Sequence, residues 1–390
     1  MSPTHISADP GRGDACPGAL RLHAADDGSL ARVRIPGGVL TVAQARALGG
    51  LAGRLGDGSL HLTSRGNVQL RGLRDGCGGE LADALGAAGL LPSPAHERVR
   101  NVVASPMSGL DGGGHVDVRG WLRELDAALC ASPVTPELSG RFLFALDDGR
   151  GDVAGLGPDV LVRGLPGGDG LLSVGGASLR LPYEDAARAA VRAAEVFVAA
   201  AREVSGRRVW RVRELGLSTA ALTALLNRPG PGSPAVGGAG WSGAGAPEHG
   251  ERERGERTGG AAVPGIPLPF GTAGPDRWAA LVDRAAGLPA RELRLTPWRR
   301  VVIPGATEHE PPPDTPWTRV GACIGRPGCA RSHTDVRADA TAALAGAHPV
   351  LPTYWSGCAR RCGRPAGTYV DVTARPDGGY DTTTLAPDPR

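Results

Sequence analysis

The stretch SLHLTSRGNVQLRG, residues 59–72, predicts two antiparallel strands joined by a tight turn. Apolar and polar residues alternate on both sides of its central Ser-Arg-Gly, which is typical of half-buried strands. Upstream, residues 30–35 alternate as a further strand, and Thr41 is a suitable N-cap for a helix over residues 42–55. With a second helix expected at residues 79–88, the order strand, helix, strand, strand, helix predicts a ferredoxin-like half-domain.

A similar order of elements returns in the second part of the chain. The matching elements are strands at 266–270, 292–296 and 301–303 and a helix at 275–286. Arg294-Leu295-Thr296 stands where His61-Leu62-Thr63 stands in the first part. We interpret this pattern as an internal duplication at low identity.

An α/β region is expected between the two halves. Its predicted elements are strands at 116–118, 142–146 and near Val160 and Leu171, with helices at 121–129 and 183–204. Residues 228–262 are rich in Gly, Pro and Ser and then in charges, which is typical of a flexible linker. Residues 1–15 have no apolar pattern, and we expect them to be disordered.

The composition restricts the partners. The chain has 390 residues, 41% of them apolar, and a net charge of +3, too small to indicate nucleic-acid binding. All 43 basic residues are arginine, so any anion site must use guanidinium groups, which bind carboxylates bidentately. We find no secretory signal and no run that could span a membrane, so we expect a cytoplasmic protein with reduced thiols.

Four of the seven cysteines gather near the end of the chain: Cys323, Cys329, Cys358 and Cys362. In a reduced compartment such a set indicates metal binding rather than disulfides. A gap of five residues followed by one of three fits poorly to the tight paired turns of structural zinc. Wide loops flanked by glycines favour a [4Fe–4S] cluster, because backbone N–H groups are free to point at sulfur. Zinc and unligated buried thiols are the alternatives.

The pattern C-x5-C followed by C-x3-C resembles the cluster signature of the sulfite and nitrite reductase family. Other segments resemble its basic motifs: residues 63–72, Arg100-Asn101-Val102 with Pro106, and Gly140-Arg141-Phe142 ahead of Asp147-Asp148-Gly149. The resemblance covers nearly the whole chain outside the termini and the linker. It implies an α+β fold in which duplicated ferredoxin-like half-domains and two α/β lobes surround a pseudo-twofold axis.

This fold divides the chain into six expected segments. They are a disordered N-terminus (1–18), a first half-domain (19–95), a first α/β lobe (96–227), a flexible linker (228–262), a second half-domain (263–312) and a second lobe with the cluster (313–390).

The family's reductases use sirohaem, bridged to the cluster through one cysteine, which by position is Cys362. Their basic residues bind the anionic substrate, and this implies catalytic roles for Arg65, Arg100 and Arg141. The fourth basic position falls on Leu143. Because leucine supplies neither charge nor protons, a sirohaem-dependent sulfite or nitrite reductase is the second interpretation.

The chain resembles more closely the precorrin-3B synthase branch of this family, through Cys16-Pro17-Gly18, Asp27-Gly28 and Arg34 near its start. This resemblance implies O2-dependent hydroxylation of precorrin-3A at C20 with γ-lactone formation, in aerobic cobalamin synthesis. It also implies a mononuclear non-haem iron, for which none of the histidines has a suitable spacing. The implied electron donor is NADH with a reductase, or a ferredoxin.

Precorrin-3A carries many carboxylates, so an arginine-lined cleft suits it. Beside the three arginines, we expect Asn67, Gln69, Arg71 and Asn101 to contact this tetrapyrrole. Asn67, Gln69 and Arg71 alternate along a strand, however, and a merely solvated strand face is the competing interpretation. A binding module stabilised by a cluster or by zinc, without catalysis, is the third overall alternative.

Overall fold

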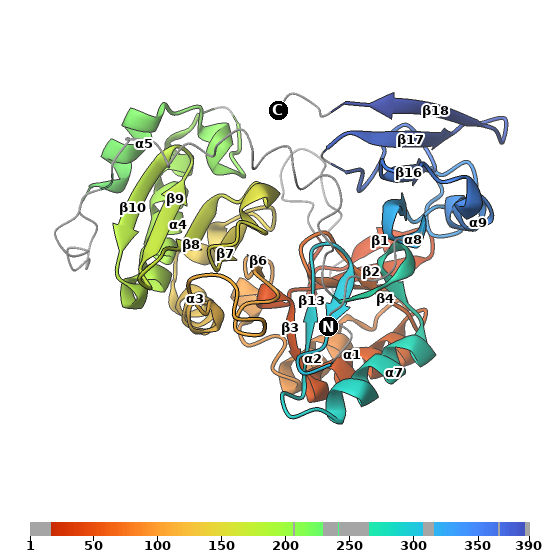
Figure 1. The fold of residues 1–390 in the computed structure, drawn as a ribbon, viewed down its shortest axis with the longest axis horizontal. Coiled ribbons are helices and arrows are strands. Elements are labelled where there is room, and N and C mark those ends of the chain that lie inside the picture. Colours follow the sequence, from red (N-terminus) through yellow and green to blue (C-terminus); the bar gives the residue numbers. More distant parts are fainter. Residues whose placement is uncertain are drawn as a thin grey trace.

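The computed structural model describes residues 17–205, 207–228, 241, 265–306, 316–365 and 367–386. The predicted disordered N-terminus and the predicted linker lie almost entirely outside these residues, and Cys16 lies outside them. Two interleaved half-domains form the base of the molecule, and one lobe stands on either side above them (Figure 1).

The first half-domain follows the predicted order of elements. It contains β2 (Gly28–Val33), α1 (Val42–Leu55), β4 (Leu60–Leu62), β5 (Val68–Leu73) and α2 (Gly78–Ala87), with β1 (His23–Ala25) at the edge of its sheet. Thr41 begins α1 with a capping box, in which its hydroxyl accepts from the Gln44 N–H and the Gln44 side chain accepts from the Thr41 N–H. Leu48 and Leu55 of α1 are buried in the same core as Val68 and Leu70 of β5.

The second half-domain repeats this order and exchanges a strand with the first. Its elements are β11 (Ile266–Pro267), β12 (Thr272–Ala273), α7 (Pro275–Ala286), β13 (Glu292–Leu295) and β14 (Arg300–Val302). β12 pairs with β4 of the first sheet, and β3 (Val39–Thr41) pairs with β13 of the second. This reciprocal exchange has the form of a pseudo-twofold relation and agrees with the predicted duplication.

Two glycines show how closely the halves approach each other. Gly38 has φ +73°, and a Cβ there would overlap the carbonyl oxygen of Leu295. Gly271 has φ +74°, and its Cβ would lie 3.1 Å from the carbonyl oxygen of Leu62. Leu62 and Leu295 are the residues that the repeat places in register. Both turns favour glycine because of the positive φ, and at Gly38 a side chain would also collide with the partner strand.

The first lobe is a five-stranded sheet in the order β10-β9-β8-β7-β6. Its strands are β6 (Val102–Ala104), β7 (Phe144–Asp147), β8 (Val160–Gly164), β9 (Gly170–Val174) and β10 (Ala177–Leu181). Apolar residues of α3 (Arg119–Ala131), α4 (Ala186–Glu203) and α5 (Thr219–Leu226) share one core with it.

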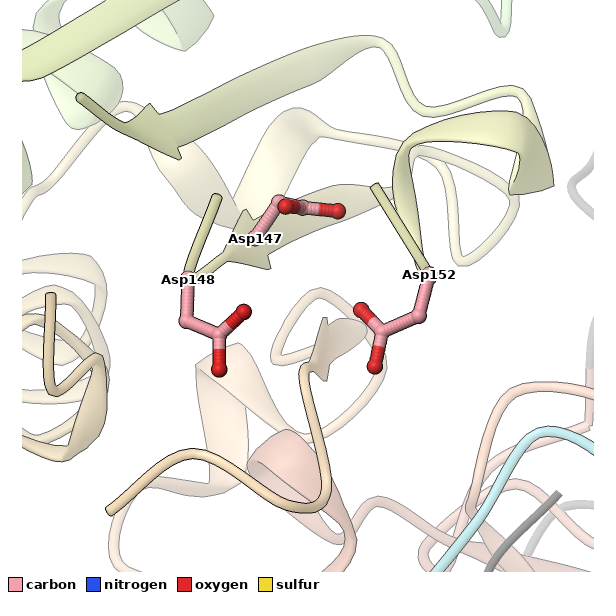
Figure 2. A group of neighbouring side chains, drawn as sticks. All are labelled: Asp147, Asp148 and Asp152. Carbon is pink, nitrogen blue, oxygen red and sulfur yellow. The ribbon is translucent and has the colours of Figure 1, made fainter. Parts of the chain in front are cut away.

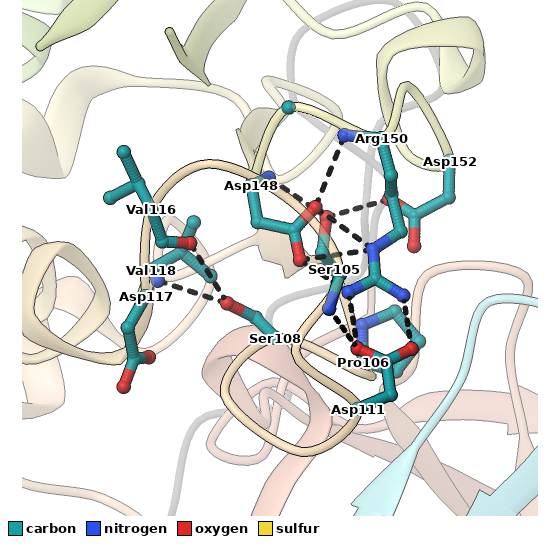
Figure 3. Close-up of polar contacts among 12 residues, drawn as sticks. Ser105, Pro106, Ser108, Asp111, Val116, Asp117, Val118, Asp148, Arg150 and Asp152 are labelled. Carbon is teal, nitrogen blue, oxygen red and sulfur yellow. Dashed lines mark hydrogen bonds and ion pairs between the residues drawn. The ribbon is translucent and has the colours of Figure 1, made fainter. Parts of the chain in front are cut away.

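The strand predicted at residues 116–118 is wrong. These residues form an irregular segment that ends at the start of α3. The Ser108 hydroxyl forms hydrogen bonds with the backbone of this segment: it donates to the Val116 carbonyl and accepts from the Val118 N–H (Figure 3). A side chain therefore replaces the partner strand that the short apolar pattern suggested.

The second lobe is a four-stranded sheet in the order β15-β16-β17-β18. β15 (Val320–Ala322), β16 (Thr353–Ser356) and β17 (Tyr369–Ala374) run parallel, and β18 (Tyr380–Leu385) is antiparallel at the edge. α8 (Pro316–Arg319) precedes the sheet and α9 (Val336–Ala342) packs beside it. Across the part of the chain that the structure describes, no helix combines the length and the apolar character needed to cross a membrane.

Candidate functional site

The two cysteine pairs begin at the same edge of the second lobe's sheet. Cys323 directly follows β15, and Cys358 comes two residues after β16. These two strands are parallel neighbours, so their carboxyl ends lie side by side. The N–H of Cys323 donates to the Trp355 carbonyl at 2.9 Å, which keeps the first cysteine close to the second loop.

Gly357 joins the cysteine loops. Its N–H donates to the Cys323 sulfur at 3.2 Å, and its carbonyl accepts from the His333 N–H at 2.8 Å. A Cβ at Gly357 would collide with the Ser332 hydroxyl, in the turn just after Cys329. The absence of a side chain therefore lets the Cys329 turn and the Cys358 turn close on one another, with a backbone donor aimed at sulfur.

The free cysteines of the second lobe form a candidate soft-metal site. Zinc at about 2.3 Å from each sulfur would hold tetrahedral thiolates roughly 3.8 Å apart. Among the described residues, no three cysteine sulfurs lie within 4.8 Å of one another. The negative charges of Cys358 and Cys362 nevertheless raise the pKa of Cys323, so the three thiols lie in one region. A cubane cluster and a single zinc ion are both bound by thiolates, so the donor set fits a soft metal centre of either kind.

The Cys323 thiol lies in a partly desolvated place. Burial raises the pKa of Cys323, while the N–H groups of Gly357 and Gly325 act in the opposite direction. A thiol in such a place becomes a thiolate when a metal binds it, and the two N–H donors then stabilise the sulfur's negative charge. The donor set and its surroundings thus fit a soft metal centre.

Arg71 connects the first half-domain to the cysteine loops. Its guanidinium forms two hydrogen bonds to Asp27, both at 2.8 Å, and donates to the Gly328 carbonyl at 2.8 Å. Next to it, the Asp26 carboxylate accepts from the Ala330 N–H. Cys329 is therefore held between two peptide groups that the first half-domain fixes, so Arg71 supports the loop rather than standing free for a substrate.

Gln69 lies on the face of the first sheet that points away from Val68 and Leu70. Its register neighbours on β2 and β4 are Arg32 and His61. Its side chain is only half-buried, whereas Val68 and Leu70 are fully buried. Gln69 is therefore a residue predicted to contact substrate whose side chain is partly accessible to solvent, on a polar face of the sheet.

Arg65 and Arg141 come together at the junction between the first half-domain and the first lobe. Arg65 belongs to the turn between β4 and β5, and its guanidinium donates to the Arg141 carbonyl at 3.3 Å. The Arg141 side chain is exposed and that of Arg65 is half-buried. Two of the three predicted catalytic arginines thus lie beside each other, and both reach solvent.

Asn67 and Asn101 form a buried network beneath this junction. The Asn67 amide donates to the Asn101 oxygen at 3.1 Å and accepts from the Ile35 N–H at 2.9 Å. Arg34 donates to the same Asn101 oxygen at 2.9 Å, and the Asn101 amide donates to the Phe142 carbonyl at 2.9 Å. Both asparagines are fully buried, so they connect the half-domain to the lobe and hold the two arginine-bearing turns in place.

Arg100 stands apart from the other predicted arginines. It forms two hydrogen bonds to Asp126 of α3, both at 2.7 Å, and donates to the Leu90 carbonyl at 3.1 Å. Only 5% of its surface is exposed. The structure therefore gives Arg100 a buried ion pair inside the protein and does not bring it to Arg65 and Arg141.

Comparison with known proteins places this architecture. The sequence profile of the nitrite/sulfite reductase ferredoxin-like half domain matches residues 23–88, which include β1 to α2. A precorrin-3B synthase from Sinorhizobium sp is 25% identical over 94% of this chain and 82% of its own length. The chain thus contains a ferredoxin-like half domain of the nitrite/sulfite reductase type and is similar to a precorrin-3B synthase over most of its length.

Other relatives match over shorter stretches of the sequence. A ferredoxin–nitrite reductase from Synechococcus elongatus is 35% identical, but over 31% of this chain and 25% of the relative. The structure of the Mycobacterium tuberculosis NirA protein covers 91% of this chain and 73% of its own, with a TM-score of 0.64 at 19% identity. That likeness extends the family fold across both lobes.

Leu143 marks a departure from the reductases of this family. It packs in a small apolar cluster with Val103, Ala145 and Leu161, against the partly buried Trp298 of the second half-domain. Only 1% of Leu143 is exposed. An apolar contact between the lobe and the half-domain thus occupies the position where the family resemblance implies a basic residue.

Asp147, Asp148 and Asp152 form a compact acidic group at the end of β7 (Figure 2). Asp147 accepts from four backbone N–H groups, those of Gly149, Gly151, Val153 and Ala154. Asp148 pairs with Arg150, which also binds Asp111, and Asp152 accepts from the Ser105 hydroxyl at 2.6 Å (Figure 3). Burial raises the pKa of Asp152 to about 6, assisted by its two acidic neighbours. These contacts indicate that the three aspartates stabilise the tight loop after β7.

The sequence prediction missed two arginines near the cysteines. Arg337 of α9 donates to the Cys323 carbonyl at 3.1 Å and to the Thr272 hydroxyl at 3.0 Å. Arg299 forms a hydrogen bond to Tyr354, whose hydroxyl donates to the Cys362 carbonyl. Neither arginine belongs to a recognisable motif. The only signal was position, because Arg337 begins a helix shortly after Cys329 and Arg299 follows the repeated Arg-Leu-Thr.

Proposed function

We propose that this chain is an iron–sulfur enzyme that hydroxylates precorrin-3A at C20, using O2, and closes the γ-lactone of precorrin-3B. The observation that carries the proposal is the correspondence with a precorrin-3B synthase along nearly the full length of both chains, whereas the reductases match over about a third of this chain or less. The buried Leu143 supports it, since a substrate cation is missing where sulfite or nitrite would bind.

Cys323, Cys329, Cys358 and Cys362 would hold a [4Fe–4S] cluster, which supplies single electrons when bound. The chain's own residues position the tetrapyrrole. Arg65 and Arg141 reach solvent side by side and suit two carboxylates of the macrocycle. Beneath them, Asn67 and Asn101 hold these two turns at a fixed separation, and Gln69 offers an amide on the adjoining sheet face.

The proposal is tested by incubating anaerobically purified protein with precorrin-3A, a reductant and then 18O2. Mass spectrometry of the product is expected to show one labelled oxygen and the lactone, with none formed under nitrogen. Changing Arg65 and Arg141 together to Gln removes two charge-assisted contacts and is expected to raise KM about a hundredfold, at ~1.4 kcal/mol for each contact, with a smaller change in kcat. Arg375→Gln, far from the two turns in sequence and exposed, is the matched control.

A sirohaem-dependent sulfite or nitrite reductase is the second candidate, favoured by the 35–37% identity of its members over their local matches. Intense red-region absorption in the purified protein, shifted by sulfite, together with sulfite-dependent oxidation of a reduced dye, would establish that candidate. Unchanged precorrin-3A in the presence of an intact cluster would reject the first.

A further inference from the structure

Arg337 is a half-buried cation in the first turn of α9. The Asp335 carboxylate caps that turn, accepting from the N–H groups of Arg337 and Ala338. The guanidinium then reaches the Cys323 carbonyl and the Thr272 hydroxyl, and lies 5.8 Å from the centre of the Phe270 ring. These contacts come from two separate parts of the chain, residues 270–272 and Cys323, so the group is held in one place.

The surroundings of Arg337 carry an excess of positive charge. Burial lowers the pKa of Arg337 to about 10, and the nearby charges of Arg299 and Arg71 act in the same direction. Within the described residues Arg337 has no carboxylate partner, and the Asp27 carboxylate is already engaged by Arg71. At neutral pH the guanidinium stays charged. A half-buried cation among other cations is costly unless an anion lies nearby.

The anion that the structure offers is the cysteine site itself. Besides the Asp335 carboxylate, which caps the backbone of α9, the Cys323 thiol and the Tyr354 hydroxyl lie near the Arg337 guanidinium and can become negative. Burial raises the pKa of Tyr354 to about 12, so this hydroxyl stays neutral. Thiolates that bind a cluster leave it with a net negative charge, and each electron added makes that charge larger. A cation fixed beside Cys323 therefore interacts more strongly with the reduced cluster than with the oxidised one.

We infer that Arg337 sets the reduction potential of the iron–sulfur site, because its guanidinium is fixed against the Cys323 carbonyl and stabilises the reduced cluster. This inference rests on the proposed cluster. Reduction adds one electron to the cluster, and no proton moves because the guanidinium remains protonated throughout. Arg299, which is half-buried like Arg337, places a second positive charge near Arg337 and Tyr354.

The test is an anaerobic redox titration with dithionite, followed by EPR of the reduced cluster. Arg337→Gln removes the charge and keeps hydrogen-bond donors, while Arg337→Lys keeps the charge. At a fixed solution potential, Arg337→Gln is expected to lower the ratio of reduced to oxidised cluster about tenfold, which equals a shift of about 59 mV for a one-electron couple. Arg337→Lys is expected to stay within about threefold of the parent. Arg375→Gln, an exposed arginine in the same lobe, is expected to match the parent protein.

Iron and sulfide analysis separates the outcomes. A parent protein without iron and sulfide contradicts the proposed cluster, whereas an unchanged potential in Arg337→Gln contradicts this inference alone. Failure of Arg337→Gln to assemble the cluster supports the inference if Arg337→Lys assembles it. Failure of both variants contradicts it, because the geometry of the guanidinium, and not its charge, is then what the site needs.

Discussion

His61 and Arg294 occupy equivalent positions in the two half-domains, yet they connect to different lobes. Arg294 donates to the carbonyls of Pro106 and Ser108 in the first lobe, each at 2.8 Å. His61 lies 3.2 Å from the Thr272 hydroxyl, which in turn accepts from Arg337 of the second lobe. The following threonines are alike, since Thr63 and Thr296 each donate to a carbonyl four residues later at 2.9 Å.

The difference lies in how the charges are used. On the side of the first lobe, buried charges find partners within the chain: Arg100 with Asp126, Arg294 with Glu292, and Asp148 with Arg150. On the side of the second lobe, Arg337 has no carboxylate partner among the described residues. The duplication thus provides two similar frames, and beside the cysteines Arg337 is held by a carbonyl and a hydroxyl instead of a carboxylate.

The largest expected effect compares the two interlocking glycines. Gly38→Ala forces a Cβ onto the Leu295 carbonyl at a left-handed φ, and we expect it to lower the free energy of unfolding by about 3–5 kcal/mol. Gly271→Ala meets mainly the flexible Arg299 side chain at 2.7 Å and is expected to lose only about 1–2 kcal/mol. Urea unfolding followed by tryptophan fluorescence measures the free energy of unfolding of both variants. Equal losses would mean that the contacts of Gly38 and Gly271 with the opposite half-domain are equally tight.

The next effect compares the equivalent polar residues. Arg294→Leu removes a buried cation and leaves Glu292 and two carbonyls without their donor, so we expect a loss of about 3 kcal/mol. His61→Leu breaks two long hydrogen bonds, of 3.2 and 3.3 Å, and is expected to lose about 1 kcal/mol. If His61→Leu is the more damaging change in the same urea experiment, the assignment of the tighter connection to the first lobe is wrong.

The smallest expected effect concerns Asp152 and depends on pH. Its pKa is raised from 3.8 to about 6 on folding, so the folded protein favours the protonated carboxyl and loses stability as pH rises between these values. Asp152→Asn keeps an acceptor for Ser105 and removes the charge. The variant is expected to be about 1–2 kcal/mol more stable than the parent above pH 6.5, with no advantage near pH 4. Chemical unfolding across this range provides the measurement, and a destabilised variant at pH 7.5 would show that the acidic group needs its full charge.

Local patterns predicted most of the fold. The ends of α1 and α7 agree with the sequence because Thr41 and Pro275 mark clear helix starts, and strand alternation located β4 and β5. The exchange of β3 and β12 between the sheets could not be predicted, because each is a strand of two or three residues whose partner lies more than 200 residues away. The strand at residues 116–118 failed because Ser108 supplies its hydrogen bonds.

The candidate site was predicted in part. Cysteine spacing predicted a metal site whose two cysteine pairs begin at one edge of the second lobe's sheet, and two separate motifs predicted Arg65 and Arg141, which the structure brings into contact. Sequence could not distinguish an arginine that faces solvent from one that is already paired, so Arg100 was placed among the substrate residues although Asp126 occupies it. For the same reason Arg337 was missed, since its position beside Cys323 depends on how α9 packs.

The most direct test of the central claim is the iron and acid-labile sulfide content of anaerobically purified protein, measured with its absorption spectrum. The account predicts about four irons and four sulfides per chain and a broad visible band that dithionite bleaches. Cys358→Ala is expected to lose both the colour and the turnover of precorrin-3A. A colourless parent with one zinc per chain, or a colourless Cys358→Ala variant that retains full activity, would contradict it.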